Sequence, residues 1–106
     1  MSAILAIWNR DGRPIDPAII DTMLTASSHR AVDGQNVYID GCVALAHQHF
    51  WLTPEEQGEV QPIIDKDASL VMTCDARLDD RDTLQKKLAI NKSQKLSDAQ
   101  LILRAF

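Results

Sequence analysis

The residue at position 2 combines a nucleophile with a base of its own. Ser2 follows the initiator Met1 and precedes an unbroken apolar run, residues 3–8. A small residue at this position permits removal of Met1, which would leave Ser2 with a free α-amine. That amine titrates at about pH 8 and can accept the proton of the hydroxyl on the same residue. The alternative interpretation is that Ser2 is simply a small residue after methionine.

Other residues with reactive side chains form weaker patterns. His47 and His49 alternate along a predicted strand, so both imidazoles lie on one face and could bind a metal. No third ligand follows at a fixed offset, and we expect no metal site. Cys42 and Cys74 stand apart without a C-x-x-C motif, which favours buried, reduced thiols. The acidic run at 79–82 is explained by a helix start, where carboxylates are stabilised by the helix dipole.

The composition is that of a small acidic globular domain. The 106 residues include 11 basic and 15 acidic side chains, for a net charge of -4, and 45% of the residues are apolar. This length suits one domain. The absence of a basic patch argues against nucleic acid and anionic membranes as partners. No apolar stretch reaches transmembrane length and no signal peptide is evident, so we expect a cytoplasmic protein.

Local patterns predict the elements that must position these side chains. Residues 3–8 read as a buried strand that ends with Trp8 in the core. Asp16 and Pro17 suit the N-cap and first turn of a helix that fades near residues 27–28. The apolar face of this helix is expected to comprise Ile19, Ile20, Met23 and Leu24. Asp40-Gly41 lies between two short β-prone runs, 37–39 and 43–47, and predicts a hairpin.

The second half of the chain has fewer strands and more helix signals. A largely buried strand is expected at 69–74, followed by a helix that starts within 79–82 and carries Leu84 and Leu88. Ser97 and Gln100 form a capping box for a last helix. Strands and helices are grouped and do not strictly alternate, which predicts an α+β fold.

Six segments, in order, resemble those of class II glutamine amidotransferases, the N-terminal nucleophile domains of asparagine synthetases. Each segment is short, but their order and spacing together are specific. The matching segments are Met-Ser-Ala-Ile at 1–4, His-Arg-Ala-Val-Asp-Gly at 29–34, Leu-Ala-His-Gln-His-Phe at 45–50, Gln-Pro at 61–62, Asp-Ala-Arg-Leu-Asp-Asp at 75–80, and Ser-Asp-Ala-Gln followed by an apolar run at 97–105.

The resemblance implies an architecture and a reaction. The family's fold is an α-β-β-α sandwich of the N-terminal nucleophile hydrolase type, and residues 1–106 resemble about its first half. Its reaction releases ammonia from glutamine, which a separate ATP-pyrophosphatase domain uses to make an amide. That synthetase domain is absent from the sequence, which has no glycine-rich phosphate loop. ATP and Mg²⁺ are therefore implied for the synthetase domain, and no cofactor is implied for this chain.

The reacting positions depart from the family pattern. Ser2 stands where the family has its nucleophilic cysteine, and a hydroxyl is a weaker nucleophile than a thiol. Asp75 replaces the asparagine of the oxyanion hole, where a carboxylate would repel developing negative charge. Ala76 replaces the glycine beside it. Asp33 belongs to a loop that the family places near the nucleophile, although a turn residue before Gly34 would explain it equally.

The substrate-binding positions depart in the same direction. His49 occupies the place of the arginine that grips the α-carboxylate of glutamine, and an imidazole lacks that two-pronged charged contact. Arg77 replaces the glutamate that recognises the substrate amine. Asp98 alone is retained from the family's glutamine-binding set.

These departures predict a degenerate amidotransferase domain that keeps the fold and lacks glutaminase activity. It would serve as scaffold or docking domain in an asparagine synthetase-like, ATP-dependent amide-forming enzyme, with the C-terminal synthetase domain as partner and a glutamine-like molecule or no ligand in its own site. One alternative is an active amidohydrolase with Ser2 as nucleophile, and another is a standalone interaction module. Half a sandwich leaves a sheet face or edge uncovered, which also predicts a homodimer or another partner that covers this apolar surface.

Overall fold

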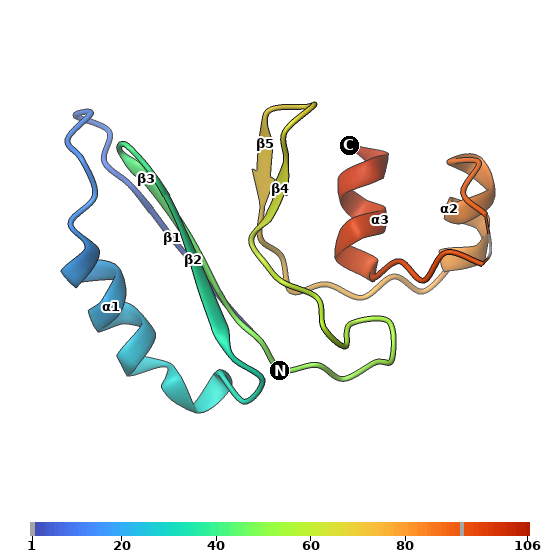
Figure 1. Cartoon of the computed structure of the whole chain (residues 1–106), viewed down its shortest axis with the longest axis horizontal. Helices are drawn as coiled ribbons and strands as arrows, with labels where there is room; N and C mark the ends of the chain where they lie inside the picture. Colours follow the sequence, from blue (N-terminus) through green and yellow to red (C-terminus); the bar gives the residue numbers. More distant parts are fainter. Residues whose placement is uncertain (1, 92) are drawn as a thin grey trace.

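The computed structural model describes residues 2–91 and 93–106, which form an α+β fold in successive layers (Figure 1). Helix α1 covers one side of a three-stranded sheet, a two-stranded hairpin stands on the other side of it, and helices α3 and α2 follow beyond the hairpin. The elements in chain order are β1 (Ala3–Trp8), α1 (Pro17–Ala26), the 3-10 helix η1 (Ser28–Arg30), β2 (Gln35–Asp40), β3 (Val43–Gln48), β4 (Ile63–Asp65), β5 (Leu70–Met72), α2 (Arg81–Lys87) and α3 (Asp98–Ala105).

The first sheet is antiparallel throughout and has the order β1-β3-β2. The predicted turn connects β2 to β3, and Gly41 takes a φ of 56°, which a glycine adopts without strain. Asp16 caps α1 by accepting a hydrogen bond from the Ala18 N–H at 3.0 Å, as the sequence predicts. The first core forms between α1 and this sheet, where Ile20 and Leu24 pack with Ile15, Ala44 and Ala46.

Two predictions about this core are wrong. Strand β1 is buried on one face only, and Trp8, which was expected in the core, is 67% exposed. Its side chain lies on the sheet face opposite α1, and the Arg10 guanidinium stacks over its ring at 5.8 Å. Ile19 is also exposed, because the buried stripe of α1 is limited to Ile20 and Leu24, with Met23 at its side.

The second half of the chain is built around α3. Leu101 and Ala99 are buried on this helix, and its N-terminus has the capping box predicted from Ser97 and Gln100. Asp80 caps α2, which also agrees with the sequence. The strand expected at 69–74 is shorter and only half-buried, Leu70–Met72, because its partner β4 is itself a three-residue strand.

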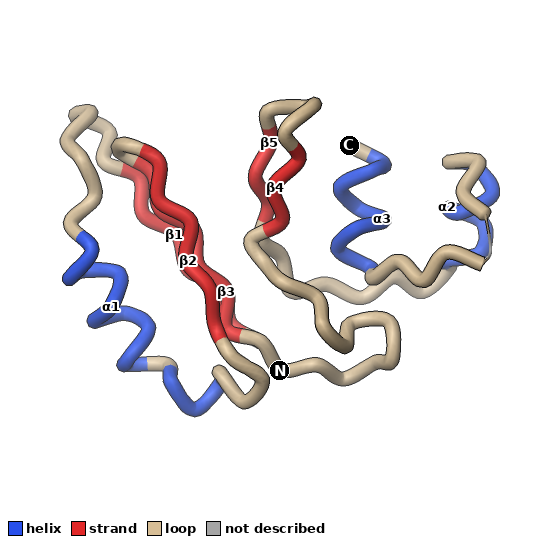
Figure 2. The backbone as a smooth tube through the Cα atoms, viewed as in Figure 1, coloured by secondary structure: helices blue, strands red, loops and turns tan. Residues whose placement is uncertain are grey.

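A long loop connects the three-stranded sheet to the two-stranded hairpin. Figure 2 shows the tan segment that follows β3, curls beneath the hairpin and returns into β4. Residues 49–62, which make this connection, have neither helix nor strand. In the part of the chain that the structure describes, no helix is long and apolar enough to cross a membrane.

Candidate functional site

Two histidines at the end of β3 join the first sheet to the hairpin. The Nδ1 atom of His47 lies 2.9 Å from the Oγ1 atom of Thr73, just after β5. The backbone N–H of Gln61, just before β4, donates to the Nε2 atom of His49 at 2.9 Å. The Gln61 side chain accepts from the Cys74 N–H at 2.9 Å. These bonds hold both ends of the hairpin against the end of β3.

A small cavity lies at this junction, beside Ser2. It offers about 20 Å³, enough for roughly one water molecule. We call it the Ser2 cavity. It is lined by Ser2, His47, His49, Trp51, Glu56, Glu59, Gln61, Cys74, Asp75, Ala76 and Ala99.

The Ser2 hydroxyl lines this cavity and is held in place by a hydrogen bond. Its Oγ accepts a hydrogen bond from the backbone N–H of Phe50 at 3.0 Å, which orients the side chain. The predicted nucleophile therefore has a fixed position in a polar cavity. Met1, whose removal the self-activating mechanism requires, lies outside the described residues.

His49 has both ring nitrogens engaged within the protein. Nε2 accepts from the Gln61 N–H, so it bears the lone pair, and Nδ1 lies 3.2 Å from the Gly34 carbonyl oxygen, to which it can only donate. The side chain is 3% exposed. His49 thus bridges the loop at Gly34 and the residue that precedes the hairpin, Gln61.

Two further ionisable groups that line the cavity, His47 and Cys74, are uncharged at neutral pH. Burial, with a smaller contribution from His49, lowers the pKa of His47 to about 4. Burial and the carboxylates of Glu59, Asp75 and Asp98 raise the pKa of the Cys74 thiol to about 11. At neutral pH the cavity therefore has neither an imidazolium at His47 nor a thiolate at Cys74.

Carboxylates supply the charge of this cavity. Glu56 accepts from the backbone N–H groups of Leu52 and Thr53, at 2.8 and 3.2 Å through the same oxygen. Glu59 accepts from the Ser97 hydroxyl and from Gln61 Nε2. Burial raises the pKa of Glu59, and the Gln61 hydrogen bond opposes that shift. Asp75 completes the set, so the lining has three carboxylates and no lysine or arginine.

An open groove of about 720 Å³ adjoins the Ser2 cavity and shares Glu56, Asp75 and Ala76 with it. A groove of this size could accommodate a small molecule. Arg77 and Asp98 line it. The carboxylate of Asp98 accepts from the Leu78 N–H at 2.8 Å and forms an ion pair with Arg81, so both of its oxygens are engaged.

The fold thus brings the sequence-predicted residues to one region. Ser2, His49, Asp75 and Ala76 line the cavity, and Arg77 and Asp98 line the groove next to it. Sequence reasoning missed Glu56, Glu59 and the buried Gln61. Gln61 was available as a signal, since the Gln-Pro pair had been singled out, but two of its three hydrogen bonds are to residues distant in the sequence, His49 and Cys74.

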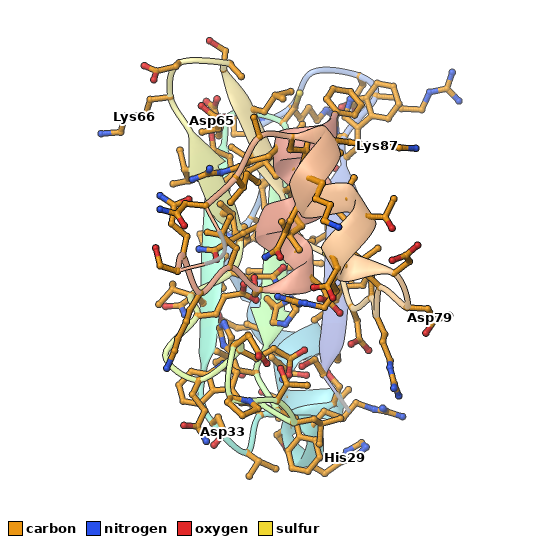
Figure 3. The ribbon with its side chains drawn as sticks, turned by 90° about the vertical axis from the view of Figure 1, so that its right-hand side faces the viewer. His29, Asp33, Asp65, Lys66, Asp79 and Lys87 are labelled. Atoms are coloured by element: carbon orange, nitrogen blue, oxygen red, sulfur yellow. The ribbon has the colours of Figure 1, made fainter. Side chains whose placement is uncertain are left out.

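Asp33 lies near the site, but its side chain is hydrogen-bonded to the backbone. Its carboxylate accepts from the Trp51 N–H at 2.8 Å, which fixes the loop against the chain after β3. Figure 3 shows Asp33 and His29 at one end of the molecule and Asp65 and Lys66 at the other. Over residues 2–91 and 93–106, no group of three or more His, Cys, Asp or Glu side chains is arranged to hold a metal ion.

The family model for the glutamine amidotransferase domain matches residues 1–106. The chain therefore belongs to the glutamine amidotransferase domain family. No curated protein and no solved structure matches it significantly.

Proposed function

We propose that this glutamine amidotransferase domain has lost the glutaminase half-reaction. In the same proposal it forms the N-terminal-nucleophile sandwich of an asparagine synthetase-like, ATP-dependent amide-forming enzyme of the cytoplasm. Its role there is to support and dock the synthetase domain, which binds ATP and Mg²⁺. The layer order of α1, sheet, hairpin and α3 is compatible with such a sandwich.

The charge of the Ser2 cavity is the observation that carries this proposal. Attack on an amide places negative charge on the carbonyl oxygen, and amidotransfer also requires a hold on the α-carboxylate of glutamine. Both are anionic, and the cavity faces them with Glu56, Glu59 and Asp75 and without a cationic side chain. Removing even one oxyanion donor costs on the order of 10²–10³ in rate.

His49 and Asp98 occupy two of the expected glutamine-binding positions, and their hydrogen bonds support the same conclusion. His49 has no free ring nitrogen for a ligand. Asp98 is held by Leu78 and Arg81, and a substrate amine would have to displace them. The cavity itself has room for about one water molecule. A glutamine side chain would have to break this network before it reached Ser2.

Chemical labelling tests whether the site recognises glutamine. The Ser2→Cys variant provides a reactive thiol, and it is treated with an electrophile built on the glutamine skeleton. A matched electrophile without the α-amino and α-carboxylate groups serves as control. We expect equal rates of labelling at position 2, read by peptide mass spectrometry. Faster labelling by the glutamine-like reagent would show that the binding pocket is intact and would overturn the proposal.

The whole enzyme provides a second test. Amide formation is expected to proceed with ammonia or an amine donor and to show no dependence on glutamine. An enzyme that forms its amide from glutamine, and loses this ability in the Ser2→Ala variant, would support the active-amidohydrolase alternative. A native gene that encodes no ATP-binding domain, in the same chain or beside it, would favour the standalone interaction module.

A further inference from the structure

The Ser2 cavity has an excess of negative charge. Glu56, Glu59 and Asp75 line it, and no lysine or arginine of the described chain does. The two imidazoles do not compensate for them. Burial lowers the pKa of His47 to about 4, and His49 is neutral because its Nε2 atom accepts a hydrogen bond. Carboxylates gathered in a partly buried place are costly unless a cation balances them.

The pKa values of two lining groups reflect this charge. Burial is the main cause that raises the pKa of the Cys74 thiol to about 11, and the carboxylates of Glu59, Asp75 and Asp98 add to it. Burial also raises the pKa of Glu59, and nearby carboxylates add to that shift against an opposing hydrogen bond. A positively charged group would therefore be stabilised at this place.

Two of the three carboxylates have an oxygen available for a cation. The two backbone N–H groups that Glu56 binds both donate to its Oε2 atom, and no hydrogen bond from the described residues reaches the carboxylate of Asp75. Glu59 differs, since its two oxygens accept from Gln61 Nε2 and from the Ser97 hydroxyl. A cation at this cavity would thus pair with Glu56 and Asp75.

The α-nitrogen of Ser2 lies at the wall of the same cavity. Ser2 lines the cavity immediately before β1, and the Phe50 N–H holds its hydroxyl at 3.0 Å. Three covalent bonds separate the nitrogen from that hydroxyl oxygen, so the two atoms are no more than about 4 Å apart. Groups that face each other across a single water molecule are roughly 6 Å apart or less. The nitrogen is therefore near the carboxylates of the lining, and its covalent attachment keeps it there whatever else packs against the domain.

We propose that removal of Met1 supplies the cation that the Ser2 cavity lacks, because the α-ammonium group of the processed chain pairs with Glu56 and Asp75. An aminopeptidase hydrolyses the Met1–Ser2 peptide bond with one water molecule, methionine leaves, and the new amine takes up a proton from solvent. An uncharged amide nitrogen thereby becomes a cation. Processing of the N-terminus would then stabilise the domain.

This pairing has a consequence for the chemistry of Ser2. An ammonium group has no lone pair, so it cannot accept the proton of the hydroxyl on the same residue. The inference rests on the proposed function and deepens it, since it gives the loss of glutaminase activity a further cause, a base that is held protonated.

The protonation of Ser2 can be measured directly, once intact mass confirms that Met1 is absent. The probe is acetic anhydride, whose rate of reaction with the α-amine at a series of pH values is read by mass spectrometry of the N-terminal peptide. We expect a pKa at least about one unit above the value of about 8 for a free α-amine, and hence a roughly tenfold smaller unprotonated fraction at pH 7. In urea the pKa should return to about 8.

Matched substitutions identify the partners. Glu56→Gln and Asp75→Asn remove the charge and preserve the size of each side chain, and each should lower the pKa of the Ser2 amine toward 8. The controls are Glu55→Gln and Asp79→Asn, which remove the same charges from residues that line the adjoining groove but not the cavity. The controls should leave the pKa of the amine nearly unchanged.

Stability provides a second readout. A pKa that is raised in the folded state stabilises the protein below about pH 8, and this contribution is lost as the pH rises through the folded value. Acetylation of the Ser2 α-amine removes the charge, so we expect it to lower the melting temperature at pH 7. In the double variant with Glu56→Gln and Asp75→Asn, the same acetylation should have much less effect.

A pKa of about 8 or lower for the Ser2 amine would overturn the proposal, as would a raised pKa that Glu56→Gln and Asp75→Asn leave unchanged. The first measurement needs no substitution, so it decides the matter even where a variant does not fold. An ordinary pKa without glutamate release would refute this pairing alone. Release of glutamate that depends on Ser2 would instead refute the loss of glutaminase activity.

Discussion

The Nε2 atom of His49 accepts a hydrogen bond from the backbone N–H of Gln61 at 2.9 Å, in a region that is almost completely buried. This bond crosses from the end of β3 to the start of the hairpin. It occupies a ring nitrogen that a ligand would need, so under the proposed loss of glutaminase activity the contact that joins the first sheet to the hairpin also closes this position to a ligand.

His49→Ala is therefore expected to destabilise the protein. The variant leaves the Gln61 N–H without a partner in a buried setting, which costs about 1–3 kcal/mol of unfolding free energy. Urea denaturation measures this change. His29→Ala, at an exposed position, should change stability by less than about 0.5 kcal/mol and serves as control. Equal stability of the two variants would contradict the bridging role of His49.

His47 makes stability depend on pH. Its pKa falls from 6.5 to about 4 on folding, so the unfolded chain binds more protons between these values. Stability contributed by this group is present above pH 6.5 and is lost as the pH falls toward 4, by at most about 3 kcal/mol. Glu59 acts in the opposite sense, since its raised pKa favours folding at low pH. The His47→Gln variant should therefore lose the downward slope between pH 6.5 and 4, measured by thermal unfolding.

Asp98→Ala tests whether this carboxylate serves the structure. Its loss leaves the Leu78 N–H without a partner and removes the ion pair with Arg81 at the start of α3, and we expect a cost of about 2 kcal/mol. The matched control is Asp67→Ala, an exposed carboxylate in the β4–β5 turn, with almost no effect expected. A stable Asp98→Ala protein would indicate that Asp98 is free to bind a ligand.

The Cys74 thiol should react slowly. With a pKa near 11 in place of 9.0, its thiolate fraction at pH 8 is about a hundredfold smaller than that of an unshifted thiol. The Cys42→Ser variant isolates Cys74, and its rate of alkylation by iodoacetamide can be compared in the folded chain and in urea. Unfolding should accelerate the reaction strongly. Equal rates would mean that the burial and carboxylates around Cys74 do not act as described.

Local signals predicted much of this fold because their causes are local. The Asp16 and Ser97 caps, the turn at Gly41 and the extent of β1 each depend on a few adjacent residues. The exposure of Trp8 could not be predicted in this way, since an apolar run does not reveal which sheet face another layer covers. The family resemblance located Ser2, His49 and Asp75 near one another, but the bonds that occupy His49 come from Gly34 and Gln61, which only the fold brings near.

Release of glutamate from glutamine by the mature chain tests the central claim most directly. Intact mass first establishes that Met1 has been removed and that Ser2 has a free amine. We predict a rate no higher than that of the Ser2→Ala variant, because the cavity opposes both the oxyanion and the α-carboxylate. Glutamate release that clearly exceeds this background and disappears in the Ser2→Ala variant would contradict the account.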